Sequence, residues 1–352
     1  MRSEDLPTSA LDWPSNGHSL ILGRYSDDAG LQFAEQARDG SWRIGAHVPG
    51  TRNVSHAAWS ARHRKLYAVR EEDSGAIDVI APDEDWLLVA SASTAGSKPC
   101  HCALDKSEQF LAVANYGSGD VVVFSLDPNG VPKPGPWQYH GSGHGPDAER
   151  QEGPHAHWVG FSPDEGWLVQ TDLGADLVRS FAFAPSRGMD GEIKLALQAP
   201  PGSGPRWMHF GLAGADALLV RELDSTLGLY SWTDGELYEW DRRSTRGPEA
   251  EGTNLAGHLA VNKAGDRIYV TNRGDDTVSL FAIKAGHLDR TTTFPSGGKS
   301  PRYLCLVEEG DLLFVGHEDE GPTAIFDVSG ATPRRVGQLA IEKVAWIGLR
   351  PR

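Results

Sequence analysis

Residues 55–80 read SHAAWSARHRKLYAVREEDSGAIDVI, and this stretch decides the fold. It contains three short apolar segments, at residues 55–59, 65–69 and 76–80, and polar turns separate them. Short segments rich in β-branched, aromatic and small apolar residues, bounded by turn signals, are typical of antiparallel strands joined by hairpins. Residues 100–124 repeat the same arrangement. The sequence therefore predicts a repeating antiparallel unit.

The unit recurs along the whole chain. Taking the second residue of each opening segment as an anchor gives six positions: His56, His101, His157, Trp207, His258 and Tyr303. Successive anchors lie 45, 56, 50, 51 and 45 residues apart. Four-stranded propeller blades repeat at roughly 40–50 residues, so the spacing indicates propeller blades. A β-sandwich or two small β-domains is the alternative, and the regular spacing disfavours it.

The two ends of the chain supply a seventh unit. Residues 19–23 and 30–34 resemble the second and third strands of a blade, and the last apolar run, residues 344–349, could provide its missing first strand. Pairing the ends closes the ring and removes exposed strand edges. We therefore expect an all-β, seven-bladed β-propeller of four-stranded blades that forms a single domain over residues 1–352, with residues 1–18 loosely ordered.

Composition limits the partners and the location. The chain of 352 residues carries 48 acidic and 33 basic residues and a net charge of −15, which argues against non-specific nucleic-acid binding. No apolar run reaches about 18 residues, so no membrane partner is expected. The N-terminal residues lack the pattern of a signal peptide, and three cysteines give no disulfide framework. We expect a cytoplasmic protein; the sequence does not indicate its oligomeric state.

Setting the repeats in register places a candidate binding site at one end of the propeller axis. The start of the innermost strand and the end of its antiparallel neighbour meet at the same edge of a blade. The residues fifteen after each anchor are Glu71, Tyr116, Asp172, Glu222, Arg273 and Glu318. The residues just before each anchor are Ser55, Cys100, Ala156, Arg206, Gly257 and Arg302. Most are charged or aromatic and they differ between blades, as expected when each blade contributes one group to a binding site.

The residue types of this set favour a small anionic, oxygen-rich ligand. Guanidinium groups bind carboxylate or phosphate through a planar fork, and imidazoles and buried carboxylates are the usual proton-transfer groups. The alternatives are structural. His56, His101 and His258 would then bond the backbones of neighbouring blades, and Arg302 would simply pair with Glu318.

Neither a metal nor another cofactor is expected. In Cys100-His101-Cys102, strand alternation points His101 away from the two thiols, and His155-Ala156-His157 lacks a third ligand in register. No Gly-x-Ser-x-Gly motif suggests a covalent serine mechanism. The longest polar loop, residues 132–154, contains Gly141, Gly143 and Gly145 together with His140, His144 and Arg150, and long loops in compact folds are often functional.

Several motifs resemble one known family. They are Lys98-Pro99-Cys100-His101 with Ala114-Asn115-Tyr116-Gly117, Pro154-His155-Ala156-His157 with Thr171-Asp172-Leu173-Gly174, Gly204-Pro205-Arg206 with Arg221-Glu222-Leu223, and Thr271-Asn272-Arg273-Gly274. In order over about residues 20–328, they are similar to the lactonase family of seven-bladed propellers. That family includes the bacterial propeller-type 6-phosphogluconolactonase and the fungal carboxy-cis,cis-muconate cyclase.

The resemblance implies a catalytic set of one His, two Arg and one Glu, which falls on His157, Arg206, Glu222 and Arg273. Further substrate-binding candidates are Glu71, His101, Tyr116, His155, Asp172, Arg302 and Glu318. The chain departs from the family pattern at Trp207, which stands where a histidine is usual.

We therefore expect a metal-independent lactone hydrolase that acts on a small anionic sugar lactone, with 6-phosphogluconolactone as a candidate. Glu222 or His157 would act as general base, and Arg206 and Arg273 would stabilise the oxyanion or hold a phosphate or carboxylate. Two alternatives stay open. One is a cyclase that forms a lactone from an unsaturated diacid, and the other is a non-enzymatic propeller that binds a small molecule or protein at this rim.

Overall fold

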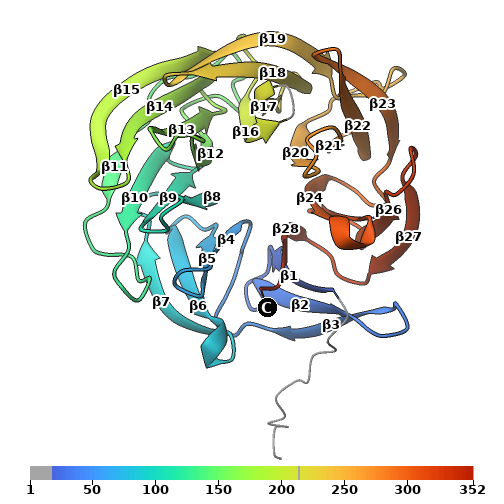
Figure 1. The fold of residues 1–352 in the computed structure, drawn as a ribbon, viewed down its shortest axis with the longest axis horizontal. Helices are drawn as coiled ribbons and strands as arrows, with labels where there is room; N and C mark the ends of the chain where they lie inside the picture. Colours follow the sequence, from blue (N-terminus) through green and yellow to red (C-terminus); the bar gives the residue numbers. More distant parts are fainter. Residues whose placement is uncertain (1–17, 213–214, 352) are drawn as a thin grey trace, which may run out of the picture.

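The computed structural model describes residues 18–212 and 215–351, which form seven four-stranded antiparallel sheets. Figure 1 shows the sheets arranged as blades around a common axis, in the order of the chain. The predicted seven-bladed β-propeller is confirmed. The predicted loose segment, residues 1–18, lies outside the described residues except for His18.

Each blade runs from an innermost strand at the axis to an outermost strand at the periphery. Blade 1 comprises β28 (Val344–Leu349), β1 (Ser19–Arg24), β2 (Leu31–Gln36) and β3 (Trp42–His47), and blade 2 comprises β4 (Ala57–Ser60), β5 (Lys65–Arg70), β6 (Ala76–Ala81) and β7 (Leu87–Ser93). Blade 3 comprises β8 (Pro99–Leu104), β9 (Phe110–Asn115), β10 (Asp120–Ser125) and β11 (Trp137–Tyr139). Blade 4 comprises β12 (Ala156–Phe161), β13 (Trp167–Asp172), β14 (Leu177–Ala184) and β15 (Gly188–Gln198).

Blades 5 to 7 follow the same plan. Blade 5 comprises β16 (Pro205–Leu212), β17 (Ala215–Arg221), β18 (Thr226–Thr233) and β19 (Glu236–Ser244). Blade 6 comprises β20 (Ala256–Val261), β21 (Ile268–Asn272), β22 (Thr277–Lys284) and β23 (His287–Pro295). Blade 7 comprises β24 (Pro301–Val307), β25 (Leu312–His317), β26 (Thr323–Asp327) and β27 (Arg334–Leu339). Two short 3-10 turns, Pro82–Glu84 and Glu308–Gly310, complete the assignment. Among the described residues, no helix has the length and apolar character that crossing a membrane requires.

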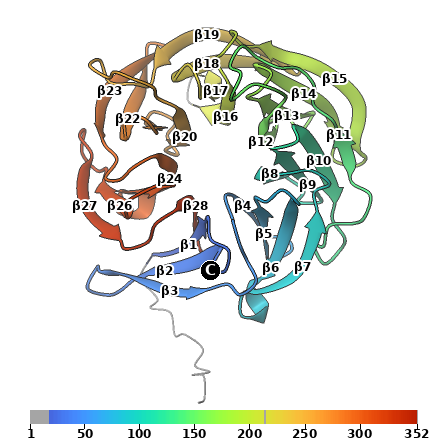
Figure 2. The same ribbon diagram turned by 180° about the vertical axis from the view of Figure 1, so that it is seen from behind.

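The ring closes as predicted. Strand β28 pairs antiparallel with β1, so that Leu349 lies opposite Leu20 and Trp346 opposite Gly23. Figure 2 shows the same closure from behind, with β28 on the axis beside β1. Because both ends of the chain build one blade, the inner edge of β1 is paired and blade 1 has four strands like the other blades.

The hydrophobic core lies between blades. One buried cluster joins Tyr67 and Ile77 of blade 2 to Leu111 and Phe124 of blade 3, and comparable clusters join other neighbouring blades. The outermost strand β7 alternates between exposed and half-buried residues, because only one face of this strand packs on a neighbour. Apolar side chains buried between the faces of neighbouring blades therefore hold these blades together.

A β-bulge marks the start of the innermost strand in every blade except blade 2. In six sheets the register shifts at this point, for example between Pro205 and Trp207 in blade 5 and between Pro301 and Tyr303 in blade 7. A bulge sets two residues of one strand opposite a single residue of its partner and re-aims their side chains. Two consecutive residues at the start of these six strands can therefore face the axis.

The pairing corrects the predicted register of blade 4 by one residue. Ala156 pairs with Asp172, as Pro205 pairs with Arg221 in blade 5, so the anchor of blade 4 is Trp158 and not His157. The error arose because a histidine stands one place before the true anchor and resembles the histidine anchors of other blades. In the corrected register His157 aligns with Arg206 of blade 5.

Candidate active site

Two layers of side chains lie at the propeller axis, one beneath the other. The first is an ionic cluster with these members: Glu71, Arg150, His157, Arg206, Glu222, Arg273, Arg302 and Glu318. The second is an aromatic layer with one ring from each blade: Trp346, His56, His101, Trp158, Trp207, His258 and Tyr303. Consecutive residues of the innermost strands, such as Arg206 and Trp207, belong to different layers.

Glu222 stands at the centre of the ionic cluster. It follows the last residue of β17 and has no solvent-exposed side-chain surface. Its Oε1 lies 2.5 Å from Nη2 of Arg150, and its Oε2 lies 2.6 Å from Nη2 of Arg273 and accepts a hydrogen bond from Nη1 of Arg206. Burial by itself would raise the pKa of Glu222, but the three guanidinium groups outweigh it and hold this pKa well below its usual range. Glu222 is therefore a carboxylate at neutral pH.

His157 is a neutral imidazole beside this carboxylate. Its Nε2 lies 2.7 Å from Nη1 of Arg206, which can only donate, so Nε2 accepts and Nδ1 carries the proton. Burial, assisted by the charge of Arg206, lowers the pKa of His157 well below its usual value. Neither Nδ1 of His157 nor Nε of Arg273 has a hydrogen-bond partner among the described residues. These two buried donors therefore lack an acceptor among the described residues.

The other half of the ionic cluster is built on blades 1, 2 and 7. Arg302 donates from Nη1 to Glu318 Oε2 at 2.6 Å, as one of our alternatives predicted, and its Nη2 lies 3.9 Å from Glu71. Arg273 contacts Glu318 at 3.2 Å and so joins the two halves. Tyr25, which we did not predict, donates to Glu71 at 3.0 Å from the corresponding rim position of blade 1. The alignment of the repeats did not include Tyr25, because the N-terminal part of blade 1 contains no anchor residue.

The ionic cluster carries an excess of positive charge. Its four guanidinium groups face three carboxylates, whereas the whole chain has a net charge of −15. Burial raises the pKa of Glu318, but Arg302 and Arg273 outweigh it and lower this pKa to about 2. Burial and the charge of Arg273 lower the pKa of Arg206 to about 10, so this guanidinium stays protonated at neutral pH. An anionic ligand is thus electrostatically favoured here.

The aromatic layer closes the axis beneath the cluster. The ring of Trp207 lies 4.2 Å from that of His258, 4.8 Å from His101 and 5.8 Å from His56, so it spans from blade 5 to blades on the opposite side. Each of the three histidines accepts a backbone N–H of the following blade through Nδ1, at 3.3–3.4 Å. These contacts fit the structural role that we gave as their alternative, and they place His101 in this layer instead of among the ionic groups.

Three other predicted residues lie at the edge of the cluster. The rings of Tyr116 and His155 stack with centroids 4.5 Å apart, and Nδ1 of His155 bonds the carbonyl oxygen of Tyr116 at 2.9 Å. Asp172 is fully buried and accepts hydrogen bonds from the backbone of His155 and from Arg179. The corrected register explains this: Asp172 aligns with Arg221, and Leu173 takes the rim position of blade 4.

Arg150 is the main residue that the predicted site lacked. It belongs to the loop between β11 and β12, and it reaches Glu222 on blade 5. Alignment of the repeats could not identify Arg150, because the loop that carries this residue has no counterpart of equal length in the other blades. The only signal was the unusual length and polarity of residues 132–154.

The cysteines and histidines do not converge on a common point. Cys100 donates to the carbonyl oxygen of His157 at 3.2 Å, and the thiol of Cys102 lies 3.7 Å from Nδ1 of His56. Within the part of the chain that the structure describes, no three His, Cys, Asp or Glu side chains are grouped so as to hold a metal ion.

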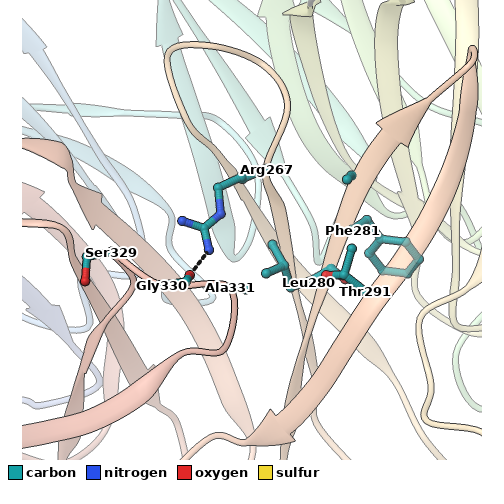
Figure 3. Close-up of a pocket in the computed structure, with 8 residues that line it drawn as sticks. Arg267, Leu280, Phe281, Thr291, Ser329, Gly330 and Ala331 are labelled. Carbon is teal, nitrogen blue, oxygen red and sulfur yellow. Dashed lines mark hydrogen bonds between the residues drawn. The ribbon is translucent and has the colours of Figure 1, made fainter.

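A separate cavity of about 290 Å³ lies between blades 6 and 7 (Figure 3). Arg267 is the only charged residue in its lining, and its guanidinium donates to the carbonyl oxygens of Val328 and Gly330. The lining holds no carboxylate or imidazole that could transfer a proton. The ionic cluster, which contains both carboxylates and an imidazole, is therefore the better candidate for an active site.

Comparison with known proteins agrees with this architecture. A 6-phosphogluconolactonase of Bacillus subtilis is 27% identical over 292 residues, which are 80% of this chain and 82% of the relative. The solved structure of a periplasmic gluconolactonase of Pseudomonas aeruginosa superposes with a TM-score of 0.85 at 24% identity, covering 95% of this chain and 99% of that one. A protein from Lactobacillus plantarum gives a TM-score of 0.85 at 23% identity, covering 95% and 100%. At these identities the solved structures establish the fold alone. The family model "Lactonase, 7-bladed beta-propeller" matches residues 20–340, and the chain belongs to this family.

Proposed function

We propose that this protein hydrolyses a small sugar lactone that carries an anionic group, and that the reaction takes place at the ionic cluster. The carrying observation is the buried carboxylate of Glu222, which is surrounded by three guanidinium groups and lies beside the neutral imidazole of His157. The 6-phosphogluconolactonase relative makes 6-phosphogluconolactone the first substrate to test.

Lactone hydrolysis makes three demands on a site. A water oxygen must lose a proton as it attacks the carbonyl carbon, the carbonyl oxygen develops negative charge, and the ring oxygen takes up a proton when its bond to the carbonyl carbon breaks. Arg206 and Arg273 can stabilise the developing charge, because both guanidinium groups are almost fully buried beside Glu222. Glu222 is the proposed acceptor of the proton from water, and the same proton then passes to the leaving ring oxygen.

The low pKa of Glu222 sets a condition on this mechanism. A carboxylate held by three guanidinium groups is a weak base. An anionic substrate that accepts hydrogen bonds from Arg206 and Arg273 would weaken the ion pairs of these two residues with Glu222. The carboxylate of Glu222 would then become a stronger base. The free N–H of His157 and of Arg273 would at the same time gain an acceptor. The proposal therefore links the binding of an anion to the activation of the base.

A hydrolysis panel tests the proposal. Purified wild type, Glu222→Gln and the control Glu236→Gln, a change at the first residue of the outermost strand β19 of the same blade, are assayed with gluconolactone, 6-phosphogluconolactone and muconate-derived diacids. We expect the wild type and the control to hydrolyse a sugar lactone and Glu222→Gln to lose at least about 100-fold in kcat. Lactone formation from a diacid would instead favour the cyclase. Absence of turnover in the wild type would overturn the proposal.

A further inference from the structure

The structure assigns Arg150 a separate role: we propose that its guanidinium binds the charged substituent of the substrate and thereby selects anionic over neutral lactones. This inference rests on the proposed lactonase function and adds a specificity residue to the same site. Arg150 is not among the four catalytic residues that the family resemblance implies, and it comes from a loop instead of a blade.

The loop that carries Arg150 is firmly attached to the propeller. Gln151 is fully buried, and its Nε2 donates to the carbonyl oxygen of Leu173 at 2.9 Å. The carboxylate of Asp147 accepts the backbone N–H groups of Glu149 and Arg150, and Nη2 of Arg179 donates to the carbonyl oxygen of Ser142 at 2.8 Å. The position of Arg150 is therefore fixed in the free protein, which lowers the ordering cost of binding a ligand there.

Arg150 approaches Glu222 from the solvent side. Its side chain is 31% exposed, whereas those of Arg206 and Arg273 are 5% and 8% exposed. Its Nη2 contacts Glu222 at 2.5 Å and donates to the hydroxyl of Tyr116 at 3.3 Å. A ligand that enters from the rim meets Arg150 before it reaches the two buried guanidinium groups.

Because the guanidinium groups differ in exposure, we assign them different roles in substrate binding. The buried pair, Arg206 and Arg273, lies beside the proposed base and suits the carbonyl group. The exposed Arg150 suits a group remote from the reacting carbon, and its planar fork matches the oxygens of a phosphate or a carboxylate. The cluster has one guanidinium more than it has carboxylates, so a substrate anion on Arg150 offsets the excess positive charge of the cluster as a whole.

The test compares a charged and a neutral substrate of the same ring. Wild type, Arg150→Gln, Arg150→Lys and the control Arg52→Gln are assayed with 6-phosphogluconolactone and gluconolactone. Arg52 is a suitable control because it lies in the loop between blades 1 and 2, is 48% exposed and pairs with Glu72, outside the ionic cluster. Melting temperatures of all variants check that the fold is retained.

For Arg150→Gln we expect kcat/KM to fall about 10- to 100-fold more for the phosphorylated lactone than for gluconolactone, and the difference between the two substrates to lie mainly in KM. Arg150→Lys should recover part of the loss, and Arg52→Gln should behave as wild type. Equal losses for both lactones in Arg150→Gln would overturn the proposal, because Arg150 would then act only by positioning Glu222.

Binding separates this inference from the proposed function. If the wild type hydrolyses neither lactone, the lactonase proposal fails, and calorimetric titration with 6-phosphogluconate and gluconate decides the role of Arg150. Tighter binding of 6-phosphogluconate by the wild type, reduced at least about tenfold in Arg150→Gln, would support an anion site. Equal affinity of wild type and variant for 6-phosphogluconate would overturn it.

Discussion

The ionic cluster and the aromatic layer are made from neighbouring residues of the same strands. Arg206 and Trp207, or Arg302 and Tyr303, are adjacent in the chain and separated by the bulge of their innermost strand. The aromatic layer has a ring in every blade. The residue that precedes this ring differs between blades: it is Ala345 in blade 1, Cys100 in blade 3 and Arg206 in blade 5. One position of the repeat therefore maintains packing, and the position beside it is free to vary. The comparison predicts opposite effects for substitutions in the two layers.

The largest effect is expected from Arg206→Gln in the ionic cluster. Loss of one donor to a developing oxyanion costs roughly 3–4 kcal/mol of the barrier, so kcat should fall about 100-fold or more. The free energy of unfolding should change little, because Glu222 keeps Arg150 and Arg273 as partners. Steady-state kinetics and urea denaturation of the same preparation check both statements. A large loss of stability with unchanged kcat would reverse the assignment of the two layers.

Trp207→Ala should do the opposite. The indole contacts rings from four other blades, so its removal leaves a space on the axis and should lower the free energy of unfolding by about 3–4 kcal/mol. Urea denaturation measures the loss, and Trp207→Phe, which keeps a ring, should lose less. If Trp207→Ala is as stable as the wild type, the aromatic layer does not hold the blades together.

Asp172→Asn tests the corrected register. Asp172 is buried and forms an ion pair with Arg179 at 2.7 Å. The substitution Asp172→Asn should lower the free energy of unfolding by about 2–3 kcal/mol. This loss is smaller than is usual for a broken buried ion pair, because asparagine keeps one oxygen acceptor. The kcat/KM of the folded enzyme should stay within about threefold of wild type. A fall of 100-fold would instead return Asp172 to the substrate-binding set.

The smallest effect concerns pH. Burial lowers the pKa of His56 from 6.5 to about 3, so between these values the unfolded chain takes up a proton that the folded protein does not. Stability therefore falls as pH drops below about 6.5, and His56 alone should account for roughly 1 kcal/mol between pH 7 and 5.5. His56→Asn keeps an acceptor for the backbone N–H of Cys102 and does not titrate. Its unfolding free energy should fall less steeply with acid than that of wild type, and an identical slope would contradict the account.

The sequence predicted the blades well because strand pattern and repeat length are local properties. It also predicted that the C-terminal strand completes the first blade. The same repeat, together with the family resemblance, named His157, Arg206, Glu222 and Arg273, and the structure brings these four side chains into one cluster.

What the sequence missed depends on information that a repeat does not carry. Arg150 reaches the cluster from an irregular loop, and only the path of that loop in space shows it. The one-residue error in blade 4 arose because His157 looks like an anchor, and strand pairing alone reveals that Trp158 fills that place. The separation of Arg206 from Trp207 requires a bulge, which strict strand alternation does not predict.

The central claim is that the ionic cluster, and not the aromatic layer or the peripheral cavity, receives the substrate. A crystal structure of the wild type with 6-phosphogluconate, the product of the proposed reaction, tests it most directly. We expect the product carboxylate within hydrogen-bond distance of the guanidinium groups of Arg206 and Arg273, above Trp207. Binding between blades 6 and 7 near Arg267, with the ion pairs of Glu222 unchanged, would contradict the account.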